Sequence, residues 1–227
     1  MPAMLVLMPA RNEARTIGPI VEKVKARLPV LVIDDGSTDD TAAAARKAGA
    51  EVVSHPTNLR KGAALKTGFS WALRNNYEAV ITMDADGQHD PADLDKFLDA
   101  YAERPSHIMI GEREFSKMPW PNRLTTPLGS GILSRALGVR VTDNQSGFRL
   151  LSRHFLENVQ LGSTGYEMEV EMIWEAVRLR IPIVWIPIRT LYFPDRKSGF
   201  RRIHDTLRFL RMVWHIWRER VHQERHG

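Results

Sequence analysis

Short apolar runs that alternate with amphipathic segments are the feature that most restricts the fold of this chain. The runs have the length and composition of buried strands and lie at residues 3–8, 30–33, 50–54, 79–83 and 106–110. Segments with apolar residues at helical spacing connect them, and residues such as Pro29 and Gly49 mark where helices stop. Strands that alternate with helices predict an α/β fold, in which a mostly parallel, Rossmann-like sheet is flanked by helices.

The predicted helices divide the chain. They cover residues 13–28, 38–48, 61–75, 92–103, 124–137 and 170–179. A further strand is expected at residues 181–187, and a basic amphipathic helix at residues 200–221. We therefore predict one α/β domain over residues 1–199, followed by a C-terminal helix and tail over residues 200–227.

The composition excludes several kinds of site. The chain has no cysteine, so disulfides, thiolate nucleophiles and Cys-ligated zinc are excluded. No segment reaches the roughly 18–20 apolar residues of a membrane span. We therefore predict a cytoplasmic chain, and peripheral association with the cytoplasmic face of the membrane is compatible with this prediction. The net charge of +5 favours an anionic partner, such as nucleic acid, a phosphorylated ligand or an anionic membrane.

Charged side chains gather where the predicted strands end. They are Asp34 and Asp35 after the second run, Asp84 and Asp86 after the fourth, and Arg113 after the fifth. Ligands bind at the carboxyl ends of the strands in an open parallel sheet, so these side chains are expected to converge on one edge. Carboxylates held close together repel each other unless a cation lies between them. Mg²⁺ or Mn²⁺, which prefer oxygen ligands, would serve.

The segment after residue 83 also fits a simpler interpretation. Aspartate is common in turns and at helix N-termini, so Asp84 and Asp86 could serve only a turn or cap the helix that starts near Pro91. A turn at Gly87 would instead let one carboxylate face a metal ion and the other a hydroxyl, with Gln88 as a further ligand. Several such clusters at strand ends favour the metal site over capping.

Five motifs, in this order, resemble those of a known family. They are Pro-Ala-x-Asn-Glu at 9–13, Val-Ile-Asp-Asp-Gly-Ser-x-Asp at 32–39, Asn-x-Arg-Lys-Gly at 58–62, Asp-Ala-Asp-Gly-Gln at 84–88, and Asp-x-x-Ser-Gly-Phe-Arg at 143–149. The chain resembles family 2 glycosyltransferases with the GT-A fold. More narrowly, it resembles dolichyl- and polyprenyl-phosphate sugar transferases of the dolichol-phosphate mannosyltransferase type. The resemblance covers residues 4–211.

The resemblance implies roles for the residues at these positions. The nucleotide-sugar donor would contact Pro9, Arg11, Glu13, Asp34, Asp35, Lys61, Asp84, Ala85, Arg113, Arg196 and Lys197. The metal ion, Mg²⁺ or Mn²⁺, would be held by Asp84, Asp86 and Gln88. The expected catalytic residues are Asp86, Arg113, which would bind phosphate, and Asp143, which would lie close to the sugar's reacting carbon.

One more segment matches the family's pattern, and two places depart from it. Glu167, Glu169 and Glu171 lie in a segment like the family's acidic helix start. Many relatives carry an aromatic residue where this chain has Arg11, which leaves base stacking there open. The loop at 194–200 reads Pro-Asp-Arg-Lys-Ser-Gly-Phe rather than the common Gly-x-Ser-Lys form.

The implied reaction is an inverting displacement at the anomeric carbon of a GDP-mannose or UDP-glucose type of donor. A polyprenyl or dolichyl phosphate acceptor is already ionised at pH 7 and needs no base, whereas a hydroxyl acceptor would need a carboxylate. The candidate ligands of an acceptor phosphate are Arg123, Arg135 and Arg149. Arginines of this kind also occur on solvated surfaces and in surface ion pairs.

The predicted C-terminal helix carries an apolar stripe and many arginines. The stripe consists of Ile203, Leu207, Leu210, Trp214 and Trp217. Tryptophans beside arginines suit a helix that lies on an anionic membrane. The same pattern also fits a helix that packs on the domain core or on a second subunit of a homodimer.

The sequence is also compatible with other functions. The nearest keeps the fold and donor but uses a soluble saccharide or another small molecule as acceptor. A nucleotidyltransferase would need a Gly-rich loop after the first strand, where this chain has Arg-Asn-Glu-Ala. The basic pI also suggests a nucleic-acid-binding module, but acidic strand ends would repel phosphates, so we predict no nucleic-acid partner. A non-catalytic sugar-nucleotide sensor is a further alternative.

Overall fold

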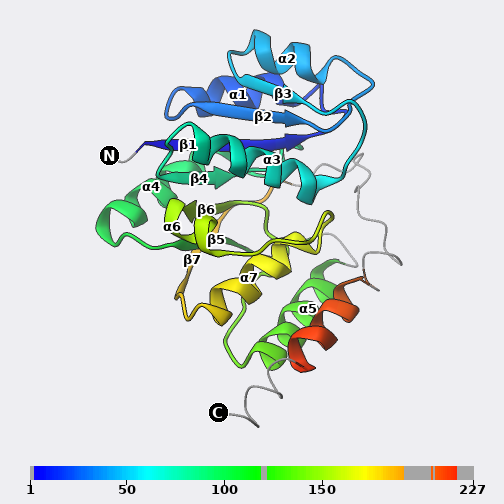
Figure 1. The fold of residues 1–227 in the computed structure, drawn as a ribbon, viewed down its shortest axis with the longest axis vertical. Helices are drawn as coiled ribbons and strands as arrows, with labels where there is room; N and C mark the ends of the chain where they lie inside the picture. The colour runs from blue at the N-terminus through cyan, green and yellow to red at the C-terminus, as the bar shows by residue number, and fades with distance from the viewer. Residues whose placement is uncertain (1–2, 119–121, 192–205, 207, 219–227) are drawn as a thin grey trace.

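One mixed sheet of seven strands runs through the protein in the order β3-β2-β1-β4-β6-β5-β7 (Figure 1). The structure is a computed structural model, and it describes residues 3–118, 122–191, 206 and 208–218. The strands are β1 (Met4–Ala10), β2 (Val30–Asp34), β3 (Glu51–Ser54), β4 (Ala79–Thr82), β5 (Ile108–Arg113), β6 (Arg149–Ser152) and β7 (Ile183–Ile188). All six strands predicted from the sequence are present, and β6 is an addition.

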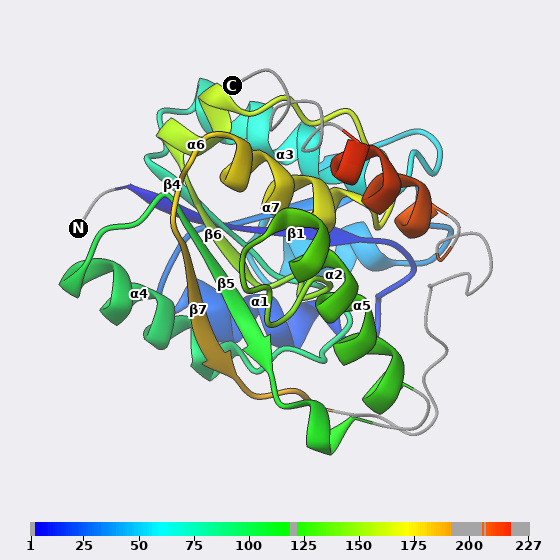
Figure 2. The ribbon, with the colours of Figure 1, turned by 90° about the horizontal axis from the view of Figure 1, so that it is seen from below.

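Helices cover both faces of the sheet (Figure 2). The helices are α1 (Ile17–Lys25), α2 (Thr41–Lys47), α3 (Lys61–Arg74), α4 (Leu94–Glu103), α5 (Asn122–Leu137), α6 (Arg153–Asn158) and α7 (Met168–Arg178), with short 3₁₀ turns η1 (Pro91–Asp93) and η2 (Phe115–Lys117). One hydrophobic cluster joins the sheet to α3, α5, α6 and α7, and a second joins it to α1, α2 and α4. This two-sided cover confirms the predicted α/β class.

The apolar strand runs follow from this double burial. Successive side chains of a strand point to opposite faces. Along β1, Leu5 and Leu7 enter the cluster under α3, while Met4, Val6 and Met8 enter the cluster under α1. A strand covered on both faces therefore needs apolar residues at every position rather than at alternate ones.

Strand β6 changes the predicted order of the sheet. It is inserted between β4 and β5 and runs antiparallel to both. Strand β5 therefore does not neighbour β4, although the two run in the same direction and their carboxyl ends lie at the same edge. Strand β6 carries little strand signal in the sequence, because it is four residues long and begins with an arginine.

Two predicted helices are shorter than expected because their first residues tie two loops together. Helix α1 begins at Ile17 rather than at residue 13, and α2 begins at Thr41 rather than at residue 38. The Asn12 carboxamide oxygen accepts a hydrogen bond of 2.8 Å from the Thr38 N–H, and the Glu13 N–H donates one of 2.7 Å to the Thr41 hydroxyl. The loop after β1 is thereby fixed against the loop after β2.

The C-terminal helix, which we define as residues 208–218, lies beside α5 (Figure 1). One side packs against the hydrophobic core through Phe209, Met212, Val213 and Ile216. The other side exposes Leu210, Trp214 and Trp217. The predicted domain boundary at residues 199 and 200, and Ile203 and Leu207 of the predicted stripe, lie outside the described residues. Among the residues described, no helix is both long and apolar enough to cross a bilayer.

Candidate functional site

The carboxyl ends of β2, β1 and β4 meet at one edge of the sheet. Ala10 of β1 is in register with Asp34 of β2, and Leu7 of β1 with Thr82 of β4. The loops that follow are joined, because the Thr16 hydroxyl donates a 2.9 Å hydrogen bond to the Ala85 carbonyl. The predicted convergence of the first, second and fourth strand ends is therefore present.

Asp35 is the buried anchor of this edge. Its carboxylate accepts hydrogen bonds of 2.8 Å from the backbone N–H groups of Leu59 and Arg60. The Nδ1 atom of His55 lies 2.8 Å from the same carboxylate. Arg60 adopts a left-handed conformation with φ 80°, which is strained for a residue other than glycine. Asp35, predicted to contact the donor, thus holds the strained loop that presents the next residue, Lys61.

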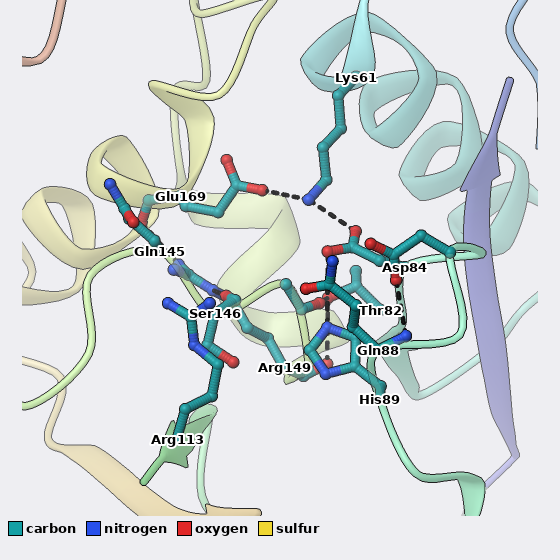
Figure 3. Close-up of polar contacts among 12 residues, drawn as sticks. Lys61, Thr82, Asp84, Gln88, His89, Arg113, Gln145, Ser146, Arg149 and Glu169 are labelled. Carbon is teal, nitrogen blue, oxygen red and sulfur yellow. Dashed lines mark hydrogen bonds and ion pairs between the residues drawn. The ribbon is translucent and has the colours of Figure 1, made fainter. Parts of the chain in front are cut away.

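Lys61 joins two carboxylates from different elements (Figure 3). Its ammonium lies 2.6 Å from Asp84 Oδ1 and 2.7 Å from Glu169 Oε1. Burial disfavours the charged ammonium, but the two carboxylates outweigh burial and hold the pKa of Lys61 above its ordinary value. Burial would likewise raise the pKa of Asp84, but Lys61 and His89 outweigh it and hold that pKa well below its ordinary value. Lys61 and Asp84 are therefore both charged near neutral pH.

The segment after β4 makes the turn that was expected from the sequence. Gly87 has a φ of 79°, and the Gln88 N–H donates a hydrogen bond of 2.9 Å to Asp86 Oδ1. Beyond the turn, His89 Nε2 lies 3.5 Å from Asp84 Oδ2. The turn therefore returns a histidine to the first of the two aspartates.

The donor set of this turn fits a divalent cation that is shared with a ligand. Among the described residues, no group of three or more His, Asp or Glu side chains is arranged to hold a metal ion. Mg²⁺ in proteins is often bound by only one or two carboxylates together with substrate phosphates. Asp84 and Asp86 supply carboxylate oxygens, and Asp84 is partly exposed, with a side-chain exposure of 27%. Oxygen donors of this kind suit Mg²⁺ or Mn²⁺.

Arg113 is held by Asp143. The Arg113 Nε and Nη2 atoms donate hydrogen bonds of 2.6 and 2.8 Å to the two Asp143 oxygens. Asp143 is 0% exposed, and it also accepts hydrogen bonds from the N–H groups of Gln145 and Ser146. The Asp143 carboxylate thus orients the guanidinium of Arg113. Its place close to the sugar's reacting carbon stays a prediction.

Arg149, predicted to bind an acceptor phosphate, is a core residue instead. It is 1% exposed and donates hydrogen bonds of 2.8 Å to the Ser146 carbonyl and 2.6 Å to the Glu169 carbonyl. Burial lowers the pKa of its guanidinium to about 10, although the carboxylates of Glu169 and Asp143 oppose this shift. Because its donors are used inside the protein, Arg149 leaves the acceptor set.

The other two candidate acceptor ligands are exposed but far apart. Arg123 and Arg135 both lie on α5, twelve positions from each other. At 1.5 Å per residue, this spacing separates their backbones by about 18 Å along the helix axis. Arg123 and Arg135 therefore stay two separate predicted ligands of an acceptor phosphate.

The remaining predicted donor residues lie near the end of β1, in the turn after β4, or outside the described residues. Pro9 lies at the end of β1, Arg11 is exposed in the loop that follows, and Ala85 is buried in the turn. The Glu13 carboxylate accepts a hydrogen bond of 3.0 Å from the Thr16 hydroxyl. Arg196 and Lys197 lie outside the described residues.

Gly147 belongs to the site although its role was not predicted. A Cβ atom at this position would lie 2.5 Å from Asp84 Oδ2. The Gly147 carbonyl accepts a hydrogen bond of 2.7 Å from the Thr82 hydroxyl, which fixes the segment against β4. Only the motif at 143–149 signalled this position, because the close approach depends on the unexpected strand β6.

An α/β sheet that gathers aspartates, a lysine and an arginine at its carboxyl edge has the arrangement of a site for a nucleotide-linked ligand. The chain belongs to glycosyl transferase family 2, whose family model matches residues 5–160. It is therefore a glycosyltransferase, and the resemblance seen in its motifs is confirmed.

Two relatives extend the match over most of the chain. Polyprenol monophosphomannose synthase of Mycolicibacterium smegmatis is 32% identical over 217 residues, which cover 88% of this chain and 80% of that protein. Undecaprenyl-phosphate mannosyltransferase of Micrococcus luteus is 30% identical over 212 residues, covering 86% of this chain and 85% of that protein.

The fold also matches a solved structure. Glucosyl-3-phosphoglycerate synthase of Mycobacterium tuberculosis, in complex with Mn²⁺, UDP and glucosyl-3-phosphoglycerate, superposes with a TM-score of 0.72 at 20% identity. The match covers 95% of this chain and 78% of that one. At this identity the likeness supports the fold alone.

Replacing Gly147 by alanine is expected to lower glycosyltransferase activity by about 10²-fold, as loss of an electrostatic stabiliser typically does. The new methyl group would push the Asp84 carboxylate out of place, because a Cβ atom there lies 2.5 Å from it. Initial rates and thermal unfolding of the variant test this. Gly131→Ala on α5 is the matched control, since nothing lies within 4 Å of the added Cβ. Equal activities of the two variants would contradict a steric role for Gly147.

Proposed function

We propose that this chain transfers a hexose from a nucleoside-diphosphate sugar to a polyprenyl phosphate. The two relatives support this acceptor, because one is named for polyprenol monophosphomannose and the other for undecaprenyl phosphate. Both names also refer to the mannosyl group, which favours a mannosyl donor over a glucosyl one. From the chain itself, the proposal rests on Lys61 paired with Asp84 beside the Asp86 turn.

A divalent cation is part of this proposal. Asp84 and Asp86 would hold Mg²⁺ or Mn²⁺, with the Gln88 carboxamide as a further oxygen donor. When bound, such a cation stabilises the negative charge that develops on a leaving diphosphate. The partial exposure of Asp84 and the oxygen donors of the turn support this assignment.

Arg113 and Lys61 would supply the remaining positive charge for the diphosphate. The Asp143 carboxylate fixes the Arg113 guanidinium through two hydrogen bonds, so the cation is oriented before any substrate arrives. Preorganised charges of this kind stabilise a transition state without reorganisation. The acceptor phosphate carries its own negative charge and needs no base. Its attack from the face opposite the diphosphate would invert the anomeric configuration.

Transfer from radiolabelled donors tests the proposed function. The full-length protein is incubated with GDP-mannose or UDP-glucose, polyprenyl phosphate and Mg²⁺ or Mn²⁺, and the label is measured in the lipid phase. We expect metal-dependent label in the lipid with the wild type and little with Asp86→Ala. Absence of lipid-phase label from every donor, with folded protein, would overturn the assigned acceptor.

A soluble phosphorylated acceptor is the second candidate. The structural neighbour from M. tuberculosis is described in complex with glucosyl-3-phosphoglycerate, which is a sugar linked to a small phosphorylated molecule. The same assay therefore includes 3-phosphoglycerate, with products separated by charge. Label in this product and none in the lipid would establish the second candidate.

Contact with an anionic membrane completes the proposed function, since a polyprenyl phosphate is a membrane lipid. The C-terminal helix exposes Trp214 and Trp217, which are 56% and 53% exposed, and the Arg218 guanidinium stacks 4.7 Å above the Trp214 ring. On the neighbouring helix α5, Leu128 and Ile132 are exposed as well. Exposed tryptophans next to arginines suit the interface between acyl chains and anionic headgroups.

The variant Trp214→Ala/Trp217→Ala is expected to bind anionic vesicles at least about tenfold more weakly than wild type. The exposed indoles would enter the interface, and burial of one large apolar side chain contributes about 1.5 kcal/mol or more, which exceeds the 1.4 kcal/mol of a tenfold change. Sedimentation with phosphatidylserine vesicles measures the binding, and phosphatidylcholine vesicles serve as the control. Unchanged binding of the variant would place the contact elsewhere on the molecule.

A further inference from the structure

We propose that Lys61 is a resident counter-ion that a divalent cation displaces from Asp84, and that Glu169 retains the ammonium during this exchange. The inference rests on the proposed metal and diphosphate site, and it concerns how the two ligands depend on each other. Its consequence is that the metal ion binds weakly to the free protein and tightly together with a nucleoside diphosphate.

The oxygens of Asp84 are occupied before any metal ion arrives. The Lys61 ammonium lies 2.6 Å from Oδ1, and His89 Nε2 lies 3.5 Å from Oδ2 (Figure 3). Gly147 lies close to Oδ2 as well, since a Cβ atom at that position would be 2.5 Å from this oxygen. A metal ion that takes Oδ1 would meet the ammonium at close range, and like charges at that distance repel each other. The ammonium must therefore move away from Asp84.

Glu169 is built to stay in place. Its side chain is 3% exposed in the first turn of α7. The Glu169 backbone carbonyl accepts a hydrogen bond of 2.6 Å from the buried guanidinium of Arg149, which holds this turn of the helix. Because an unpaired buried charge is costly, Glu169 needs the Lys61 ammonium whether or not a metal ion is bound.

The backbone next to Lys61 is fixed against the segment that precedes Glu169. The Gly62 N–H donates a hydrogen bond of 2.8 Å to the Thr164 carbonyl, and a Cβ atom at Gly62 would lie 2.7 Å from the Thr164 backbone. The start of α3 is thus clamped to the segment before α7. The Lys61 side chain, whose ammonium stands on a flexible four-carbon stem, is the part that can move. It can turn away from Asp84 while it keeps its contact with Glu169.

This arrangement couples the two ligands. A displaced ammonium loses one of its two carboxylates, and a diphosphate oxygen beside the metal ion would replace the lost partner. Without the diphosphate, the metal ion competes with Lys61 alone and gains no such compensation. Each ligand therefore raises the affinity for the other, as reciprocal linkage requires.

Direct measurement of Mn²⁺ binding tests the exchange without relying on activity. Free Mn²⁺ is measured by electron paramagnetic resonance during titration of the full-length protein, with and without GDP or UDP, and binding of Mn²⁺ to the nucleotide alone is subtracted. We expect the wild type to bind Mn²⁺ at least about tenfold more tightly with the matching nucleotide, a typical size for coupling between sites.

Two variants are expected to change the affinity for Mn²⁺ without nucleotide in opposite directions. Lys61→Met/Glu169→Gln removes the ammonium and its buried partner together, so Asp84 is released and Mn²⁺ binds about tenfold more tightly than in wild type. Glu169→Gln alone leaves the ammonium to Asp84, so Mn²⁺ binds more weakly. Circular dichroism and melting curves verify the fold of each. If the double variant does not fold, Glu169→Gln and the wild-type coupling decide the question.

The outcomes separate this inference from the proposed function. A wild type that binds neither GDP nor UDP with Mn²⁺ would overturn the donor site, and the exchange with it. A wild type that binds both ligands without coupling, or variants that bind Mn²⁺ as the wild type does, would overturn the exchange alone.

Discussion

Asp84→Asn is expected to reduce kcat/KM for sugar transfer by about 10²–10³-fold, the usual effect of removing one preorganised electrostatic group. The amide keeps the shape of the side chain but loses the charge that would hold a cation at the end of β4. Lys61 retains Glu169 at 2.7 Å, so the substitution does not leave the ammonium unpaired and the fold is expected to persist. Initial rates at saturating Mn²⁺, with thermal unfolding in parallel, measure both effects.

Asp95→Asn is the matched control for this variant. Asp95 lies on α4 and pairs with Arg27 at the surface, where both side chains are about half exposed. Exposed ion pairs contribute little to stability, so this change should leave rate and stability close to wild type. An Asp84→Asn protein with more than a tenth of the wild-type rate would argue that the turn after β4 serves only the backbone.

Arg149→Leu is expected to lower the free energy of unfolding by about 3–5 kcal/mol, the cost of breaking a buried charged network. The guanidinium is 1% exposed and lies among carboxylates of the site, including Glu169 and Asp143. Its loss would remove one buried positive charge from among these carboxylates and would take one hydrogen-bond donor from the Ser146 carbonyl and one from the Glu169 carbonyl. Chemical denaturation of wild type and variant measures the change.

The same experiment decides between a core role and a phosphate-binding role for this arginine. Arg46→Leu is the control, because Arg46 is exposed in the last turn of α2 and surface substitutions usually change stability by less than about 0.5 kcal/mol. A folded Arg149→Leu protein of near wild-type stability, with a raised KM for the lipid phosphate, would restore Arg149 to the acceptor site.

The parts of the fold that depend on local pattern could be predicted from the sequence. The apolar runs of β1, β2 and β4 are continuous because both faces of these strands are buried, and that pattern is readable without a structure. The antiparallel insertion of β6 could not be predicted from the sequence, because it depends on pairing between strands that are far apart in the chain. Helix starts were placed too early where Asn12 and Glu13 are used for contacts between loops.

The site divides in the same way. The motifs located Asp84, Asp86 and the turn at Gly87, because such a turn depends on residues that are adjacent in the sequence. They did not reveal burial. In the sequence, Arg149 and Asp143 have the residue types of ligands. In the fold they are buried among residues of β5, β6 and α7, which take up their polar groups. The partnership of Lys61 with Glu169 likewise joins positions 108 residues apart, beyond the range of any sequence motif.

The antiparallel strand between β4 and β5 also governs the order in which the sheet can be assembled. Strands β1 to β4 find all their partners among one another, apart from the outer edge of β4, so this half can pair as soon as it has been synthesised. Strand β5 pairs only with β6 and β7 among the described strands, and both come later in the chain. The outer edge of β4 therefore stays unpaired until residues 149–152 of β6 have been synthesised. Strand β5 likewise has no partner among β1 to β4.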